Sequence, residues 1–136
     1  MSPTKRKSAV IKTEVERYVR EFQRRGIAAE WYLTFEAVPN LSSDETVLSL
    51  KWGEDYRWAH LRINLASEWV QKGGKSLRRG VLHELCHLLI APAADCVDVT
   101  FLEDSPFSIE FSRRVETSAD NIANVLWRIL EHANRD

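Results

Sequence analysis

Cysteine is scarce in this sequence, with only Cys86 and Cys96 among 136 residues. So few cysteines exclude a small secreted domain held together by disulfides. The sequence also lacks any apolar run approaching the ~20 residues that a membrane-spanning helix needs. No apolar stretch follows the basic start of the chain, as it would in a signal peptide. We therefore expect a cytoplasmic protein in a reducing environment, without a membrane partner.

A strong net charge is missing as well. Lysine and arginine number 19 and aspartate and glutamate 20, which gives a formal net charge of -1. No global field would draw nucleic acid, so we expect no nucleic-acid partner. The length and the 44% of hydrophobic residues suit one folded domain over residues 1–136. The basic residues near the start predict a flexible tail over residues 1–7.

The pattern of apolar residues predicts an α+β fold. Helical spacing over residues 8–25 indicates a first helix, with Gly26 at its C-terminal end. Alternating patterns then predict a small three-stranded sheet, either a meander or a mixed sheet. Its strands should cover residues 30–38, 46–52 and 57–65. In the last of them, Ala59, Leu61, Ile63 and Leu65 should face inward, and His60, Arg62 and Asn64 outward.

Three helices should follow the sheet. A short one is expected over residues 67–72, and a buried one over 77–90, with Ser76 as its N-cap and its end before Pro92. Residues 91–104 lack a helical period and predict a loop or small flap. The last helix should cover residues 106–132.

The buried helix contains His83-Glu84-Leu85-Cys86-His87, which is the pattern H-E-x-x-H. Positions i and i+4 share one face of a helix, so the two imidazoles can bind one metal ion. Glu84 is then placed to take a proton from a zinc-activated water. Cys86 should face the core as a small hydrophobic residue.

A catalytic zinc site needs a third protein ligand. The acidic candidates after the motif are Asp95, Asp98, Glu103, Asp104, Glu110, Glu116 and Asp120. Glu116 stands out, because Asp120, Ala119 and Ala123 share its helix face and the two alanines would allow a close approach to the motif helix. Asp120 could orient a zinc-bound histidine. The alternative is that Glu116 and Asp120 belong to a solvated helix face.

With Glu116-Thr117-Ser118-Ala119-Asp120 on a following helix, the motif resembles the H-E-x-x-H … E-x-x-x-D pattern of the gluzincins. These are thermolysin-like zinc metallopeptidases, and the small single-domain minigluzincins suit this length best. The resemblance implies the upper zincin subdomain as the fold. It also implies one Zn²⁺ bound by His83, His87 and Glu116, with Glu84 as general base and Asp120 supporting a ligand.

The same resemblance implies that the strand over residues 57–65 is an edge strand that binds the substrate backbone. Asn64-Leu65-Ala66 is similar to the peptide-binding segment of thermolysin-like enzymes, so Asn64 and Ala66 become candidate substrate contacts. The sequence departs from the larger family members by lacking their lower domain. The histidine or tyrosine that stabilises the oxyanion is therefore not evident. His132, His60 and Tyr56 could take this role, and the alternative for each is a structural or surface position.

The function indicated is that of a zinc metalloendopeptidase acting on a peptide or protein substrate. One alternative is a regulatory protease of phage or mobile-element type with a narrow protein substrate. The other is a non-catalytic binding domain in which zinc only supports the fold. Such a structural site would be closed by a fourth ligand, for which Cys96 is the best candidate.

Overall fold

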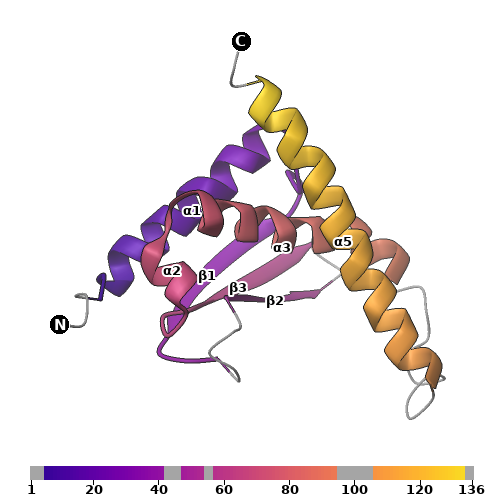
Figure 1. Cartoon of the computed structure of the whole chain (residues 1–136), viewed down its shortest axis with the longest axis horizontal. Helices are drawn as coiled ribbons and strands as arrows, with labels where there is room; N and C mark the ends of the chain where they lie inside the picture. Colours follow the sequence, from indigo (N-terminus) through magenta and orange to yellow (C-terminus); the bar gives the residue numbers. More distant parts are fainter. Residues whose placement is uncertain (1–4, 42–46, 54–56, 95–105, 134–136) are drawn as a thin grey trace.

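A three-stranded mixed sheet with helices on one side forms the frame of the computed structural model (Figure 1). The structure describes residues 5–41, 47–53, 57–94 and 106–133. The described elements follow one another in the order α1, β1, β2, β3, α2, α3, α5. Their bounds are Ser8–Arg24, Tyr32–Val38, Leu48–Gly53, Trp58–Asn64, Glu68–Lys72, Gly74–Ala94 and Pro106–Ala133. The mixed α+β fold expected from the sequence is confirmed.

The strand order is β1-β3-β2, with β3 parallel to β1 and antiparallel to β2. The expectation that residues 57–65 form an edge strand is therefore wrong. After β2 the chain returns to the middle of the sheet, so β3 pairs with β1 on one side and with β2 on the other. The edge that lies against α3 is β2, and β1 lies against α1.

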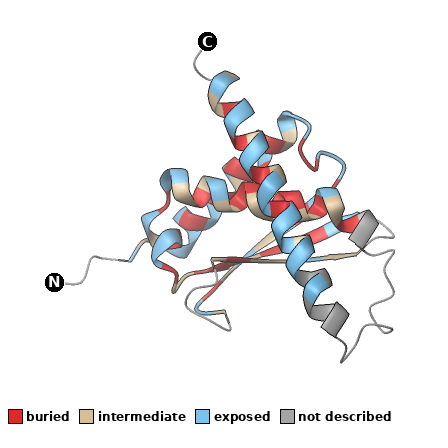
Figure 2. Ribbon diagram, turned by 45° about the vertical axis from the view of Figure 1, so that its right-hand side comes forward, coloured by how far each residue is buried: buried red, intermediate tan, exposed pale blue. Residues whose placement is uncertain are grey.

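The core lies between one face of the sheet and the helices. The predicted inward residues of β3, Ala59, Leu61 and Ile63, are buried, and α1 buries Ile11, Val15, Tyr18, Val19 and Phe22. Figure 2 shows the buried residues gathered where α3 meets its neighbours, while the outer side of α5 is exposed. Helix α3 contributes to the core from Leu77 to Ala91, and this explains why its sequence is apolar around much of its circumference.

The polar face predicted for β3 is correct for His60 and Arg62 but wrong for Asn64, which is fully buried. Its Oδ1 accepts a hydrogen bond from the backbone N–H of Ala66 at 3.0 Å. Asparagine readily forms such a local turn two residues onward. The side chain therefore closes the turn after β3 instead of continuing the alternation.

Helix α3 is longer at both ends than predicted. It begins at Gly74, so Ser76 lies inside the helix and is not its N-cap, and it continues past Pro92 to Ala94. Gly73 and Gly74 have positive φ angles of 65° and 69°, which let the chain turn directly from α2 into α3. Pro92 lies in the last turn, where one lost hydrogen bond does not end the helix.

The basic start of the chain is not a free tail at Arg6. Its backbone N–H donates to Gln71 Oε1 and its Nε to the Gln71 carbonyl, both at 2.8 Å. Its Nη2 donates to the Val70 carbonyl at 2.6 Å and to Glu14 Oε1 at 3.0 Å. These bonds tie the segment before α1 to α2, and they correct the expectation of a flexible tail over residues 1–7 at this position.

We predict opposite effects for alanine at two glycines of α3. A Cβ at Gly80 would meet only Leu48 Cδ1 at 3.9 Å, so Gly80→Ala should stabilise the protein by up to about 1 kcal/mol through helix propensity. A Cβ at Gly74 would meet nothing within 4 Å, but the φ of +69° is strained for alanine. Gly74→Ala should therefore cost about 1–2 kcal/mol.

Urea unfolding followed by circular dichroism would measure both differences. A destabilised Gly80→Ala protein would contradict the packing described around α3. An unchanged midpoint for Gly74→Ala would contradict the left-handed conformation at the start of this helix.

Candidate metal centre

His83 and His87 project from the same face of α3, one turn apart. Their ring centroids are 5.0 Å apart, and the rings are nearly perpendicular, with an interplanar angle of 78°. Both side chains are mostly enclosed, with exposed fractions of 20% and 12%. The Nε2 atoms point toward α5, which crosses over α3 (Figure 1).

Glu116 on α5 reaches both histidines. Its Oε1 lies 2.7 Å from His83 Nε2, and its Oε2 lies 3.3 Å from His87 Nε2. The approach is close because Ala119 and Ala123, on the same side of α5, are buried and small. Of the seven acidic candidates named from the sequence, Glu116 is thus brought to the histidine pair. Asp95, Asp98, Glu103 and Asp104 lie outside the described residues.

Asp120 lies on the other side of the first histidine. Its Oδ1 is 2.8 Å from His83 Nδ1, so the two ring nitrogens of His83 face two different carboxylates of α5. A carboxylate at Nδ1 fixes the orientation of the ring and leaves Nε2 for a metal. Asp120 therefore lies beside a histidine of the motif, as was expected from the sequence.

The donor atoms of His83, His87 and Glu116 fit a zinc ion. One ligand atom from each residue lies within 4.8 Å of the others. Ligands at ~2.0–2.1 Å from a tetrahedral zinc are about 3.3 Å from each other, so small side-chain shifts suffice. Two imidazole nitrogens and one carboxylate oxygen are also a donor set that catalytic zinc sites use. Asp120 is not a member of this group, but it contacts His83 from the same helix as Glu116.

Glu84 has an environment that differs from that of the other acidic residues. Burial raises the pKa of Glu84 to about 7, opposed by the neighbouring His83 and assisted by the negative charge of Glu116. A carboxyl group with a pKa near neutrality can both accept and return a proton. Glu84 follows His83 on α3, and the charges of His83 and Glu116 both act on its carboxyl group.

Burial also lowers the pKa of His87, although Glu116 and Asp120 act in the opposite direction. A lowered pKa favours the neutral imidazole. This is the form that binds a metal, because a protonated ring nitrogen has no lone pair to donate.

The two predicted substrate contacts lie at the end of β3. Asn64 is fully buried and bonded within its own turn, and Ala66 donates the N–H of that bond. Since β3 is also the middle strand, neither residue belongs to a free strand edge. The structure gives no support to the assignment of Asn64 and Ala66 as peptide-binding residues.

Other residues weighed for the site lie elsewhere. His60 Nδ1 is 2.7 Å from Thr34 Oγ1 and its Nε2 is 3.0 Å from Glu36 Oε2, on the solvent face of the sheet. Tyr56 and Cys96 lie outside the described residues. Cys86 is buried in the core as predicted, and burial raises the pKa of its thiol to about 11. Such a thiol is a poor nucleophile and a poor metal ligand at neutral pH.

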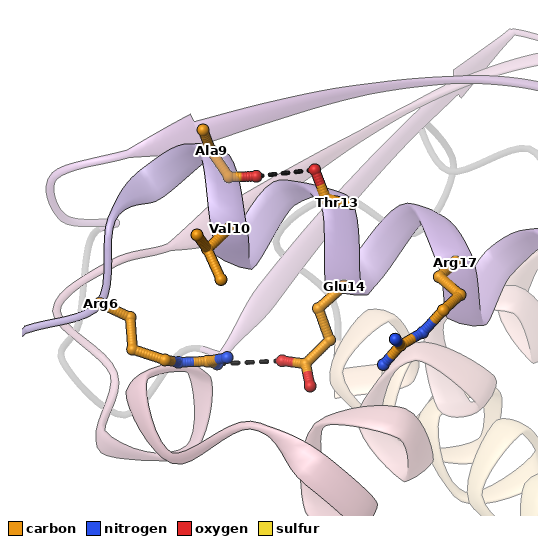
Figure 3. Close-up of a pocket in the computed structure, with 6 residues that line it drawn as sticks. All are labelled: Arg6, Ala9, Val10, Thr13, Glu14 and Arg17. Carbon is orange, nitrogen blue, oxygen red and sulfur yellow. Dashed lines mark hydrogen bonds and ion pairs between the residues drawn. The ribbon is translucent and has the colours of Figure 1, made fainter.

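A separate hollow of about 450 Å³ lies on the outer side of α1, far from this cluster in the sequence. Figure 3 shows its lining residues, with Arg6 and Glu14 paired at 3.0 Å. Thr13 donates its hydroxyl to the Ala9 carbonyl. The polar groups drawn there thus have partners within the fold, and the lining residues offer no general base beside a nucleophile or ligand set.

The polar contacts between α3 and α5 continue beyond the cluster, which was not predicted from the sequence. Arg79 Nη2 donates to Asn124 Oδ1 at 2.6 Å, one turn before His83 and one turn after Asp120. The sequence contains a sign of this contact. Arg79 lies four residues before His83, and Asn124 lies four residues after Asp120, so each pair shares one face of its helix. We call the pairs His87–Glu116, His83–Asp120 and Arg79–Asn124 the polar seam between α3 and α5.

Comparison of the chain with protein-family models, curated proteins and solved structures finds no match. In the described part of the chain, none of the helices combines the length and the apolar character needed to cross a membrane.

We predict that the purified chain binds one zinc ion per molecule and that its melting temperature rises on binding. Asp120→Asn should weaken zinc by roughly 10–100-fold, because His83 loses its support. Glu116→Gln should weaken zinc further, because a ligand is lost. Competition with a chromogenic chelator measures both affinities.

Glu110→Gln is the matched control, since Glu110 lies on the same helix and contacts Arg114 instead of the histidines. Its zinc affinity should equal that of the unmodified chain. Equal affinities for Glu116→Gln and Glu110→Gln would remove Glu116 from the ligand set.

Proposed function

We propose that the chain is a zinc-dependent metallopeptidase that hydrolyses peptide bonds, with the organisation of a small gluzincin. The observation that supports this most strongly is the reach of Glu116 from α5 to both histidines of the H-E-x-x-H helix. A histidine pair on one helix is a common coincidence. Here the Glu116 carboxylate lies near both Nε2 atoms, so that His83, His87 and Glu116 together offer three ligands. Asp120 contacts the other ring nitrogen of His83.

A zinc ion bound by His83, His87 and Glu116 would supply Lewis acidity, which polarises a carbonyl and lowers the pKa of a water molecule to roughly 7. With zinc bound, Glu84 would be the residue that accepts a proton from the attacking water and returns it to the leaving amine. The partly enclosed position that raises its pKa to about 7 suits both steps. Asp120 holds the His83 ring so that its Nε2 keeps facing Glu116.

We assign peptide binding to β2 in place of β3. Strand β2, Leu48–Gly53, is an edge of the sheet and lies against α3. An edge strand offers backbone N–H and C=O groups to an extended peptide, which gives affinity without dependence on the peptide sequence. Val47, directly before β2, lines the same hollow as His83, so the strand leads to the cluster.

We predict that zinc-loaded Glu84→Gln retains the metal but loses peptide hydrolysis by about 100-fold or more, because the proton acceptor is gone. Cleavage of a peptide library followed by mass spectrometry measures turnover, and metal analysis checks zinc. Glu68→Gln, at an exposed position of α2, is the control and should cleave normally. Hydrolysis retained by Glu84→Gln would contradict the role of Glu84.

The same library separates a general peptidase from a regulatory protease, which would cleave only a narrow set of protein sequences. A Cys96→Ser variant tests the non-catalytic reading. A structural site closed by the Cys96 thiolate would lose zinc affinity in this variant. The proposed catalytic site would keep both its affinity and its hydrolysis.

A further inference from the structure

A groove of about 680 Å³ lies beside the candidate metal centre, between α3, α5 and the segment before β2. His83 and Asp120 form one end of its lining, and Arg79 and Asn124 lie along it. Cavities of this size accept ligands of a few hundred cubic ångströms and fix them with a small number of polar groups. The groove is therefore continuous with the metal centre and large enough for part of a peptide.

The groove stays open because its floor is built from small residues. Gly80 on α3 and Ala123 on α5 both line it, and neither projects a large side chain into the space. Trp69 on α2 and Val47 form its apolar wall, and Trp69 is 58% exposed. An indole ring left in contact with solvent beside a polar group provides contact area for a ligand.

Arg79 is the cation of this groove. Its hydrogen-bond partner among the described residues is the neutral side chain of Asn124, and Trp127 lies 5.9 Å from its guanidinium. A guanidinium has five N–H donors, and one bond to an amide oxygen leaves donors available for a ligand. Among the described residues, exposed Arg79 thus has a neutral hydrogen-bond partner and no ion-pair partner.

The neighbouring cations of α3 differ from Arg79 in this respect. Lys75 pairs with Glu131 at 2.8 Å, and Arg78 pairs with Glu21 at 2.6 Å. Asp120 also lines the groove, and its Oδ1 lies 2.8 Å from His83 Nδ1. In the part of the chain that the structure describes, no carboxylate forms an ion pair with Arg79, which leaves it for an anion from outside.

We propose that Arg79 is a specificity-determining residue that binds a carboxylate of the peptide substrate. This inference rests on the proposed peptidase function. One helical turn separates Arg79 from His83, about 6 Å along the axis, so the bound carboxylate lies close to the bond that is cleaved. The carboxylate belongs either to an aspartate or glutamate side chain or to the C-terminus of the peptide. Both sources offer the planar group that a guanidinium binds with two parallel hydrogen bonds.

Binding measurements on the zinc-loaded Glu84→Gln chain test this proposal without turnover. Short peptides carry glutamate at each position in turn, and partner peptides carry glutamine at the same position. Each is prepared with a free and with an amidated C-terminus, and calorimetry gives the dissociation constants. We expect the carboxylate form to bind about tenfold tighter or more at one position, as for a hydrogen bond to a charged group.

Arg79→Met in the same background should reduce this preference to about one. Arg128→Met is the matched control, because exposed Arg128 on α5 does not line the groove, although it shares a neighbouring hollow with Arg79. It removes an equal charge nearby and should keep the preference. A side-chain source shows as a difference between glutamate and glutamine, and a C-terminal source as a difference between free and amidated ends.

The inference is overturned by a preference that survives Arg79→Met, by peptides that bind without any preference, or by no binding of acidic peptides. Cleavage of the peptide library by the zinc-loaded unmodified chain reports on the peptidase function separately. Cleavage of peptides without any preference for a carboxylate contradicts only the role of Arg79 and leaves the peptidase function intact. Binding that depends on Arg79, together with no cleavage of any peptide, contradicts the peptidase function and retains the carboxylate site.

Discussion

The close packing of α5 against α3 is the constraint on which the candidate site depends. Ala119 and Ala123 are buried at this contact, and their small size brings the backbone of α5 near enough for carboxylates to reach the histidines. A glutamate side chain spans only a few bonds, so a larger residue at either position would push Glu116 out of reach of the two Nε2 atoms. The chemistry of the cluster is thus set by two side chains that take no part in it.

The polar seam orders the charges along this contact. Its three pairs are His87–Glu116, His83–Asp120 and Arg79–Asn124. In this order the residue numbers fall along α3 and rise along α5. At one end of the seam, the carboxylates of Glu116 and Asp120 face imidazoles. At the other end, the neutral amide of Asn124 faces the guanidinium of Arg79. This one helix contact therefore places a cluster of carboxylates and imidazoles one turn away from a guanidinium.

Local patterns predicted most of this structure, because helical and strand periods are local properties of the sequence. The existence of the helices and strands, the buried face of β3 and the histidine pair could all be predicted in this way. Three features could not: the middle position of β3, the buried turn of Asn64 and the docking of Arg6 onto α2. Each depends on a partner distant in the chain or on a turn that breaks the alternation.

The helix position of Glu116 was predictable from its spacing to Asp120, but its distance from the histidines was not. The seam partner Asn124 was missed because an asparagine on a helix carries no chemical signal of its own. On α5, Ile129 is exposed although it is apolar, while Trp127 is buried against Arg78. X-ray absorption at the zinc edge tests the central claim most directly. The account predicts two imidazole nitrogens and light-atom oxygen ligands at ~2.0–2.2 Å without sulfur, and a sulfur neighbour at ~2.3 Å would contradict it.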